Sequence, residues 1–136
     1  MTDLWCLGEP LLEFNQQPDG RYLPGHGGDT SNCAIAAARQ GASVGYLTRV
    51  GQDAFGQSFL ELWDAEGVDT SCVESDPEAH TGIYFVTHNE SGHQFSYFRA
   101  GSAASRMTSA VSSAITRDSV GPRSIIVETP WRCIST

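Results

Sequence analysis

The chain has 136 residues, enough for one domain with a sizeable hydrophobic core. Its 16 acidic residues outnumber its 8 basic ones, and the net charge of −8 argues against nucleic acid or an anionic membrane as partner. Four widely spaced cysteines, without a C-x-x-C pair, predict neither a disulfide scaffold nor a zinc site. No secretory leader pattern and no apolar stretch of membrane-spanning length is found, so we expect a cytoplasmic protein.

The first forty residues predict a strand, a hairpin and a helix. The apolar run 4–7 is typical of a buried parallel strand. Residues 11–14 and 21–23 flank a Pro-Asp-Gly turn and therefore predict a hairpin. A glycine-rich loop then leads into a helix that ends at Gly41, and three adjacent residues are competent N-caps for it: Asp29, Thr30 and Ser31.

The middle of the chain continues the alternation of strands and helices. Residues 43–50 predict a second strand, and an apolar stripe predicts a helix from its N-cap Asp53 to Gly67. Strand–helix–strand–helix order with short connections implies a parallel α/β sheet. A short strand is expected near 72–74. Strand-like residues 84–87 and 94–98 flank a Gly-bearing loop and predict a second hairpin, which with the first would form a small antiparallel sheet.

The glycine-rich loop does not match the common phosphate-binding motifs. In a dinucleotide G-x-G-x-x-G motif beginning at Gly25, the third glycine would fall at position 30, which is Thr30. A Walker A loop needs a lysine, and all eight basic residues of this chain are arginines. Taken alone, the loop could be an ordinary strand-to-helix turn in which the glycines serve geometry only.

Motifs spread over residues 4–106 carry a family resemblance. They are Gly8-Glu9-Pro10, Gly27-Gly28-x-x-x-Asn32-x-Ala34, Val50-Gly51-x-Asp53-x-x-Gly56, Ala65-Glu66-Gly67-Val68, Thr81-Gly82-Ile83-Tyr84 and Tyr97-Phe98-Arg99-x-Gly101-Ser102-Ala103-Ala104-Ser105. In this order they resemble the ribokinase-like, PfkB-type carbohydrate kinases, and among these most of all the 2-keto-3-deoxygluconate kinases. The resemblance implies a ribokinase-like α/β fold: a parallel sheet flanked by helices, with a small antiparallel β lid (strands at about 9–24 and 81–99), truncated after the N-terminal part.

The resemblance also implies a chemistry and a sugar site. The chemistry is phosphoryl transfer from ATP, with Mg²⁺, to a sugar-acid hydroxyl. The implied substrate-binding residues are Gly27, Gly28, Asn32, Tyr84, Tyr97 and Arg99. A guanidinium can bind both oxygens of a carboxylate, which suits Arg99 to a keto-acid. On residue type alone, two alternatives stay open: the tyrosines could be sheet-packing residues, and Arg99 could be a solvated charge or the partner of an acidic residue.

A part of the family pattern is missing from the sequence. The catalytic Asp base of the resembled kinases lies in a G-A-G-D motif, together with the nucleotide pocket, and that motif does not occur here. We therefore predict no catalytic residue and no ATP or Mg²⁺ ligand in this chain, and expect it to be the sugar-binding half, inactive alone. A non-catalytic sugar-binding or dimerisation module, with a homodimer through the lid, and a non-functional truncated product are the alternatives.

The remaining polar candidates are given structural interpretations. We expect Asp53 to be a helix cap and little else, and Glu9 and Glu13 to be exposed lid residues. His88 and His93 stand at the two ends of the hairpin loop and could meet across it. A metal site is not expected there, because no third ligand is evident.

The last 38 residues differ from the rest in charge. Residues 1–98 hold 3 Arg and 14 acidic residues, for a net −11, whereas residues 99–136 hold 5 Arg and 2 acidic residues, for a net +3. We predict a division into a kinase-like part, 1–106, and a divergent tail, 107–136, that need not be native family sequence. Within the tail, 109–115 predicts a weak helix and 124–128 a strand.

Overall fold

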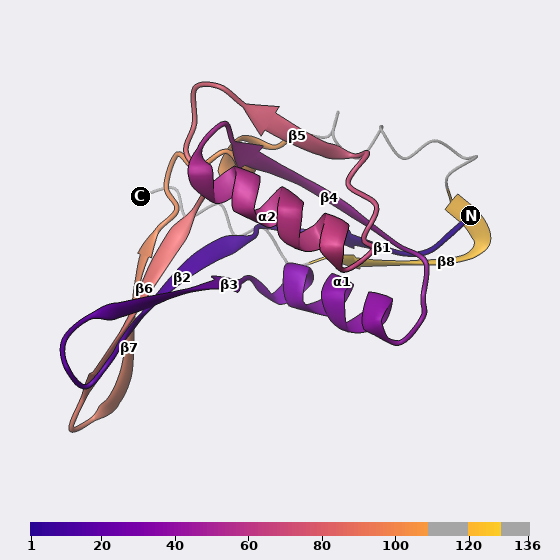
Figure 1. Ribbon diagram of the computed structural model, residues 1–136. Coiled ribbons are helices and arrows are strands. Elements are labelled where there is room, and N and C mark those ends of the chain that lie inside the picture. Colours follow the sequence, from indigo (N-terminus) through magenta and orange to yellow (C-terminus); the bar gives the residue numbers. More distant parts are fainter. Residues whose placement is uncertain (109–119, 129–136) are drawn as a thin grey trace.

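The computed structural model describes residues 1–108 and 120–128, and side chains only outside 120–123. In chain order the elements are β1 (Thr2–Leu7), β2 (Leu11–Gln16), β3 (Tyr22–Gly27), α1 (Asp29–Arg39), β4 (Val44–Gly51), α2 (Ala54–Ala65), β5 (Val73–Asp76), β6 (Ile83–Asn89), β7 (Gly92–Phe98), the 3-10 helix η1 (Ala104–Arg106) and β8 (Val120–Glu128). They form two sheets, shown in Figure 1.

The larger sheet is parallel, as the alternation of strands and helices predicted. Its strand order is β5-β4-β1-β8, and every neighbouring pair runs in parallel. Alternate residues of β1 enter different layers: Cys6 packs with Ala34 and Trp63 from the two helices, whereas Trp5 packs with Leu47 on the opposite face. Helices α1 and α2 therefore cover the same face of the sheet, side by side (Figure 1).

The strand predicted at 124–128 is confirmed and is longer than expected. It forms β8, which pairs with β1 and places Ile126 opposite Trp5. The helix predicted at 109–115 lies outside the described residues. No helix in the part of the chain that the structure describes is both long and apolar enough to cross a membrane.

The smaller sheet, which we call the lid, consists of β2, β3, β6 and β7 and extends away from the larger sheet (Figure 1). Both predicted hairpins are present, because β2 pairs with β3 and β6 with β7 in antiparallel fashion. The lid as a whole is mixed and not antiparallel, since β2 and β6 pair in parallel, with Glu13 opposite Tyr84. The two hairpins come from separate segments of the chain, and their first strands, β2 and β6, run in the same direction.

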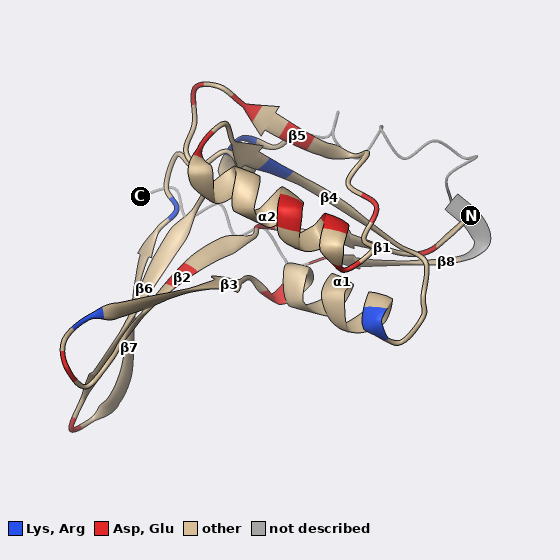
Figure 2. Ribbon diagram, in the orientation of Figure 1, with Lys and Arg blue, Asp and Glu red and all other residues tan. Residues whose placement is uncertain are grey.

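Helix α1 begins one residue earlier than the predicted caps. Its N-cap is Gly28, whose φ of 99° suits glycine, and no side chain caps the helix. The predicted caps lie inside the first turn, where two of them make other contacts: Thr30 Oγ1 lies 2.9 Å from Tyr46 Oη, and Ser31 Oγ accepts from Trp63 Nε1 at 2.9 Å. Figure 2 shows an acidic residue at the start of α1 and a basic one at its end, which suits the helix dipole.

Asp53 caps α2 as predicted, but it also joins the helix to the lid. Its carboxylate accepts from Gly56 N at 2.7 Å, and from Thr81 N and Oγ1 at 2.8 and 2.9 Å. Thr81 Oγ1 in turn accepts from Gly51 N at 2.9 Å. The end of β4, the start of α2 and the segment that leads into β6 are thus held at one carboxylate, so the description of Asp53 as a cap and little else was wrong.

Candidate sugar site

A cavity of about 390 Å³ opens between the lid and the start of α1. It is lined by Glu9, Leu11, Gly28, Asp29, Tyr84, Phe95, Tyr97 and Arg99. Four of the six residues that the sequence suggested are therefore brought together here, from β6, from β7 and its end, and from the turn before α1. The antiparallel pairing of β6 with β7 sets Tyr84 opposite Tyr97, and β3 returns the chain to Gly27, opposite Leu11.

The two glycines allow close packing around this cavity. A Cβ at Gly27 would come within 2.7 Å of Tyr84 Oη, so a side chain there would displace that ring. A Cβ at Gly28 would lie 2.6 Å from the Glu9 carbonyl oxygen, besides the unfavourable positive φ. Gly28 lines the cavity directly, whereas Gly27 contributes by leaving room for Tyr84.

Aromatic rings form the lid wall. Tyr84 and Tyr97 are stacked, with ring centroids 5.6 Å apart and planes at 29°, and Phe95 lies 6.2 Å from Tyr84. Tyr84 Oη donates a hydrogen bond to Glu13 Oε2. Burial raises the pKa of Tyr84 most, and the hydrogen bond to Glu13 and the negative charge of Glu13 raise it further. The phenol therefore stays protonated at neutral pH. Glu13 is half-buried and not exposed as predicted.

Arg99 reaches the cavity from the end of β7 and is paired with a buried carboxylate. Its Nη2 lies 2.6 Å from Glu9 Oε2, while Glu9 Oε1 accepts from Ser102 Oγ at 2.7 Å. The side chain of Glu9 is only 4% exposed, against 48% for Arg99. Burial raises the pKa of Glu9, although the Ser102 hydrogen bond and the Arg99 charge both lower it. The prediction that Glu9 is an exposed lid residue was wrong.

The local sequence explains why Glu9 is buried. Glu9 follows β1 in the connection to β2, and it faces the segment that leads from the larger sheet into β6. A Cβ at Gly82 would lie 2.6 Å from Glu9 Oε1, so the glycine leaves the space that this carboxylate fills. The resulting arrangement places at the cavity a half-exposed guanidinium that is paired with a buried carboxylate.

Asn32 does not line this cavity. It is exposed and shares one stripe of α1 with Ile35, Ala36 and Arg39, and these four residues line a separate depression of about 370 Å³ together with His26 and Leu62. His26 Nε2 lies 3.0 Å from Ser58 Oγ of α2, and burial lowers the pKa of this histidine. A role of Asn32 in sugar binding stays a prediction, since Asn32 is not among the residues that line the cavity between the lid and α1.

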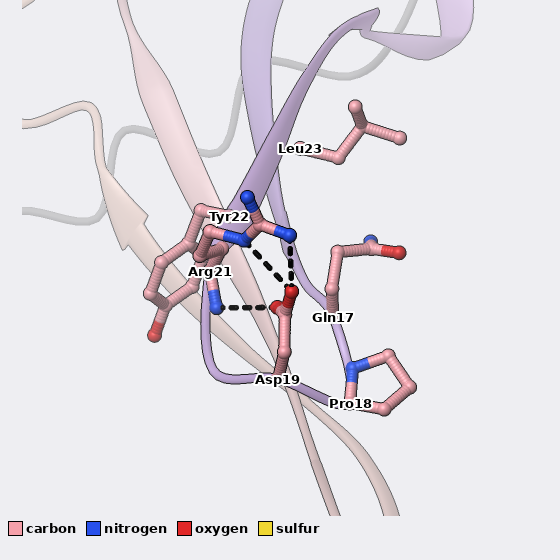
Figure 3. A pocket seen from close by; sticks show the side chains of 6 residues that line it. All are labelled: Gln17, Pro18, Asp19, Arg21, Tyr22 and Leu23. Atoms are coloured by element: carbon pink, nitrogen blue, oxygen red, sulfur yellow. Dashed lines mark hydrogen bonds and ion pairs between the residues drawn. The ribbon is translucent and has the colours of Figure 1, made fainter.

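Two further depressions are formed by the tips of the lid hairpins. One, of about 470 Å³, is lined by six residues of the β2–β3 hairpin alone (Figure 3). There Asp19 accepts from Arg21 N at 3.0 Å and from Arg21 Nε at 2.7 Å, so the turn satisfies its own charges. The other, of about 510 Å³, lies beside His88. None of the predicted sugar-binding residues lines either one.

Four lining residues were missed at the sequence level, and two of them left a signal. Phe95 is two residues before Tyr97, and residues at that spacing share one face of a strand. Asp29 directly follows the glycine pair at the helix start, where polar ligands are favoured. Glu9 and Leu11 enter the cavity through the path of the β1–β2 connection, which no local pattern reveals. Among residues 1–108 and 120–128, no group of three or more His, Cys, Asp or Glu side chains could hold a metal ion.

Comparisons with known proteins agree with this architecture. A 2-dehydro-3-deoxygluconokinase of Thermoproteus tenax is 40% identical over 116 residues, which cover 79% of this chain and 36% of the relative. A fructokinase of Escherichia coli is 35% identical over 89 residues, covering 65% of this chain and 29% of the relative. The chain thus spans about a third of the length of these curated relatives.

Solved structures give the same result. A PfkB protein from Polaromonas sp. JS666 has a TM-score of 0.76 at 32% identity, over 82% of this chain and 40% of that one. A fructokinase from Xylella fastidiosa, solved with bound ATP, has a TM-score of 0.76 at 26% identity over 82% and 37%. The family model described as pfkB family carbohydrate kinase matches residues 1–126, which reach past the quoted motifs into β8. A division of the chain at residue 106 stays a prediction. With the model matched over most of its length, the chain belongs to the pfkB family of carbohydrate kinases.

Proposed function

We propose that this chain provides the sugar-binding part of an ATP-dependent kinase that acts on 2-keto-3-deoxygluconate or a closely similar sugar acid. The observation that supports it most is Arg99, a half-exposed cation facing a cavity with a glycine turn on its other side. Fructose, the substrate named for several relatives, has no carboxylate for this guanidinium. The charge of Arg99 therefore favours the sugar acid over the neutral sugar.

The cavity supplies each contact that such a ligand needs. Arg99 would bind the ligand carboxylate through the N–H groups that Glu9 leaves free, and hydrogen bonds to charged groups contribute about 1.5–3 kcal/mol. Tyr84 and Tyr97 would cover the sugar with their stacked rings and exclude water from it. Asp29, opposite them, would accept hydrogen bonds from sugar hydroxyls at the start of α1.

The phosphoryl-transfer step is assigned to residues outside this sequence. Transfer from ATP to a hydroxyl needs a positioned base and charge stabilisation of the transferred group, and Mg²⁺ commonly supplies part of the latter. The G-A-G-D motif that carries the base in the resembled kinases is absent from the 136 residues, so we assign no catalytic, ATP-binding or Mg²⁺-binding residue here. The chain alone is expected to bind sugar without phosphorylating it, in the cytoplasm.

Calorimetric titration of the purified chain tests the proposal. We expect saturable binding of 2-keto-3-deoxygluconate and at least tenfold weaker binding of fructose. Arg99→Ala should abolish the preference, whereas Arg21→Ala, which removes an exposed lid arginine that pairs with Asp19, should leave it unchanged. Absence of heat with both sugars would reject the sugar site, and phosphate transfer from ATP in a coupled assay would reject the assignment of catalysis to other residues.

A dimerisation role is favoured by one feature of the lid. Phe95, Tyr97 and Phe98 of β7 are each more than half exposed, and β7 is an edge strand of the lid sheet. Exposed aromatic residues on an edge strand are typical of a surface that pairs with another chain. Light scattering should give a dimer mass that Phe98→Ser reduces to that of the monomer. A monomer mass at all concentrations would exclude this role, and unfolding without a cooperative transition would point to a non-functional product.

A further inference from the structure

Two histidines meet at the tip of the β6–β7 hairpin, away from the lining of the sugar cavity. His88 and His93 are directly opposite each other in the antiparallel register. Their Nδ1 atoms are 2.8 Å apart, and their rings have centroids 4.8 Å apart at an angle of 80°. Both side chains are exposed, and in the view of Figure 1 this tip is the outermost part of the lid.

Neighbouring groups define which nitrogen of His88 carries its proton. Asn15 Nδ2 donates to Glu13 Oε1 at 3.5 Å, which turns the Asn15 carbonyl oxygen toward His88. His88 Nε2 lies 2.8 Å from that oxygen and must therefore be the protonated nitrogen. Its Nδ1 is left with a free lone pair, which accepts the N–H of His93 Nδ1.

We propose that this pair is a binding site for one divalent transition-metal ion of the borderline class, such as Ni²⁺ or Zn²⁺. Metal-ligating histidines commonly donate their second ring N–H to an oxygen that fixes tautomer and orientation, and Asn15 does this for His88. The ion would take the place of the proton between the two Nδ1 atoms. The proton that His93 carries on Nδ1 would move to Nε2 of the same ring by exchange with water. Binding of the ion to two uncharged rings would therefore release no net proton.

The distances fit this substitution. Metal–nitrogen bonds of about 2.0–2.1 Å in tetrahedral geometry set two ligand nitrogens roughly 3.3 Å apart, and cis positions of an octahedron set them about 2.9 Å apart. The observed 2.8 Å needs only a small opening, which exposed side chains on opposite strands can make. No third protein ligand stands near in the described residues, which is the reason why the sequence predicted no metal here; the proposal differs in that water would complete the coordination. The 510 Å³ depression beside His88, lined mainly by polar side chains, has room for that water.

The site is connected to the sugar cavity by side-chain hydrogen bonds. His88 bonds to Asn15, Asn15 to Glu13, and Glu13 to Tyr84, which lines the cavity. All four residues lie on strands β2 and β6, whose parallel pairing holds the two hairpins together. A bound ion would fix the end of this network.

Titration of the untagged full chain with Ni²⁺ tests the site directly. We expect one ion per chain with a dissociation constant in the micromolar range, and ¹⁵N spectra that show Nδ1 of both rings as the ligands. His93→Gln should weaken binding at least tenfold, and Asn15→Ala severalfold, because the ligands remain but their orientation is lost. His26→Gln, which removes another histidine near the surface, should leave the affinity unchanged.

Two results would overturn the proposal. Equal affinity in the wild type and His93→Gln would show that the ion binds a single surface histidine or some other group. Coordination through Nε2 in the spectra would contradict the tautomer that Asn15 imposes. A far-UV circular dichroism spectrum of each variant confirms that the fold is retained, so weak binding cannot be attributed to unfolding.

Discussion

Substitution of Asp53 by alanine gives the sharpest test of how the lid is attached to the core. The substitution removes the N-cap of α2, which costs about 0.5–2 kcal/mol. It also leaves the N–H of Thr81 without its acceptor. Because Thr81 is only 2% exposed, water cannot replace that acceptor, and a buried unsatisfied donor costs about 1–3 kcal/mol. Together these terms predict a loss of about 1.5–5 kcal/mol in the free energy of unfolding.

Urea denaturation followed by tryptophan fluorescence measures this loss. The matched control is Asp64→Ala, which changes the net charge equally on the exposed face of the same helix and should shift stability by less than about 0.5 kcal/mol. A loss below 1 kcal/mol for Asp53→Ala, or one equal to that of the control, would refute the reasoning.

The pH dependence of the same variant provides an independent check. Burial raises the pKa of Asp53, but the hydrogen bonds from Thr81 and Gly56 outweigh it and hold the pKa below 3.8. A carboxylate with a depressed folded-state pKa stabilises the protein above its unfolded pKa, and this stabilisation is lost as the pH falls through the folded value. The difference between wild type and Asp53→Ala should therefore be full at pH 7 and should shrink below pH 3.8.

Three further measurements test other parts of the structure. Gly45→Ala should cost about 1–3 kcal/mol in urea denaturation, because its Cβ would clash with the Trp5 ring, and unchanged stability would contradict that packing. The ¹³C titration midpoint of Glu9 should lie above 4.5, and Arg99→Ala should raise it further, since the guanidinium lowers this pKa; a fall would disprove the pairing. Cys6, whose pKa burial and the neighbouring thiol raise to about 12, should resist iodoacetamide at pH 8 until the chain unfolds.

Local patterns in the sequence were enough to predict the elements but not all of their partners. The Pro-Asp-Gly turn and the strand-like runs identified both hairpins, because hairpin pairing is decided by neighbouring residues. The parallel pairing of β2 with β6 has no such local signal. It depends on where two separate segments leave the core, so the sequence analysis described the lid as antiparallel.

The same distinction explains the candidate site. Tyr84, Tyr97 and Arg99 were identified from the ordered motifs, and the structure places them on one cavity. The burial of Glu9 could not be predicted, because the space that it fills is created by Gly82, far away in the sequence. Asn32 was placed correctly in the first turn of α1, but it lines a different depression, between α1 and residues His26 and Leu62, and no local pattern reveals which way the first turn of a helix faces.

The parallel pairing of β2 with β6 has a consequence for the order of folding. Each hairpin closes a short loop and can form within microseconds, whereas the contact between Glu13 and Tyr84 joins residues 71 positions apart. Because closing so long a loop costs chain entropy before any contact compensates for it, we expect this pairing to wait until the core strands between the hairpins are in place. The cavity has walls from both hairpins, and it would therefore arise only in the last step of folding.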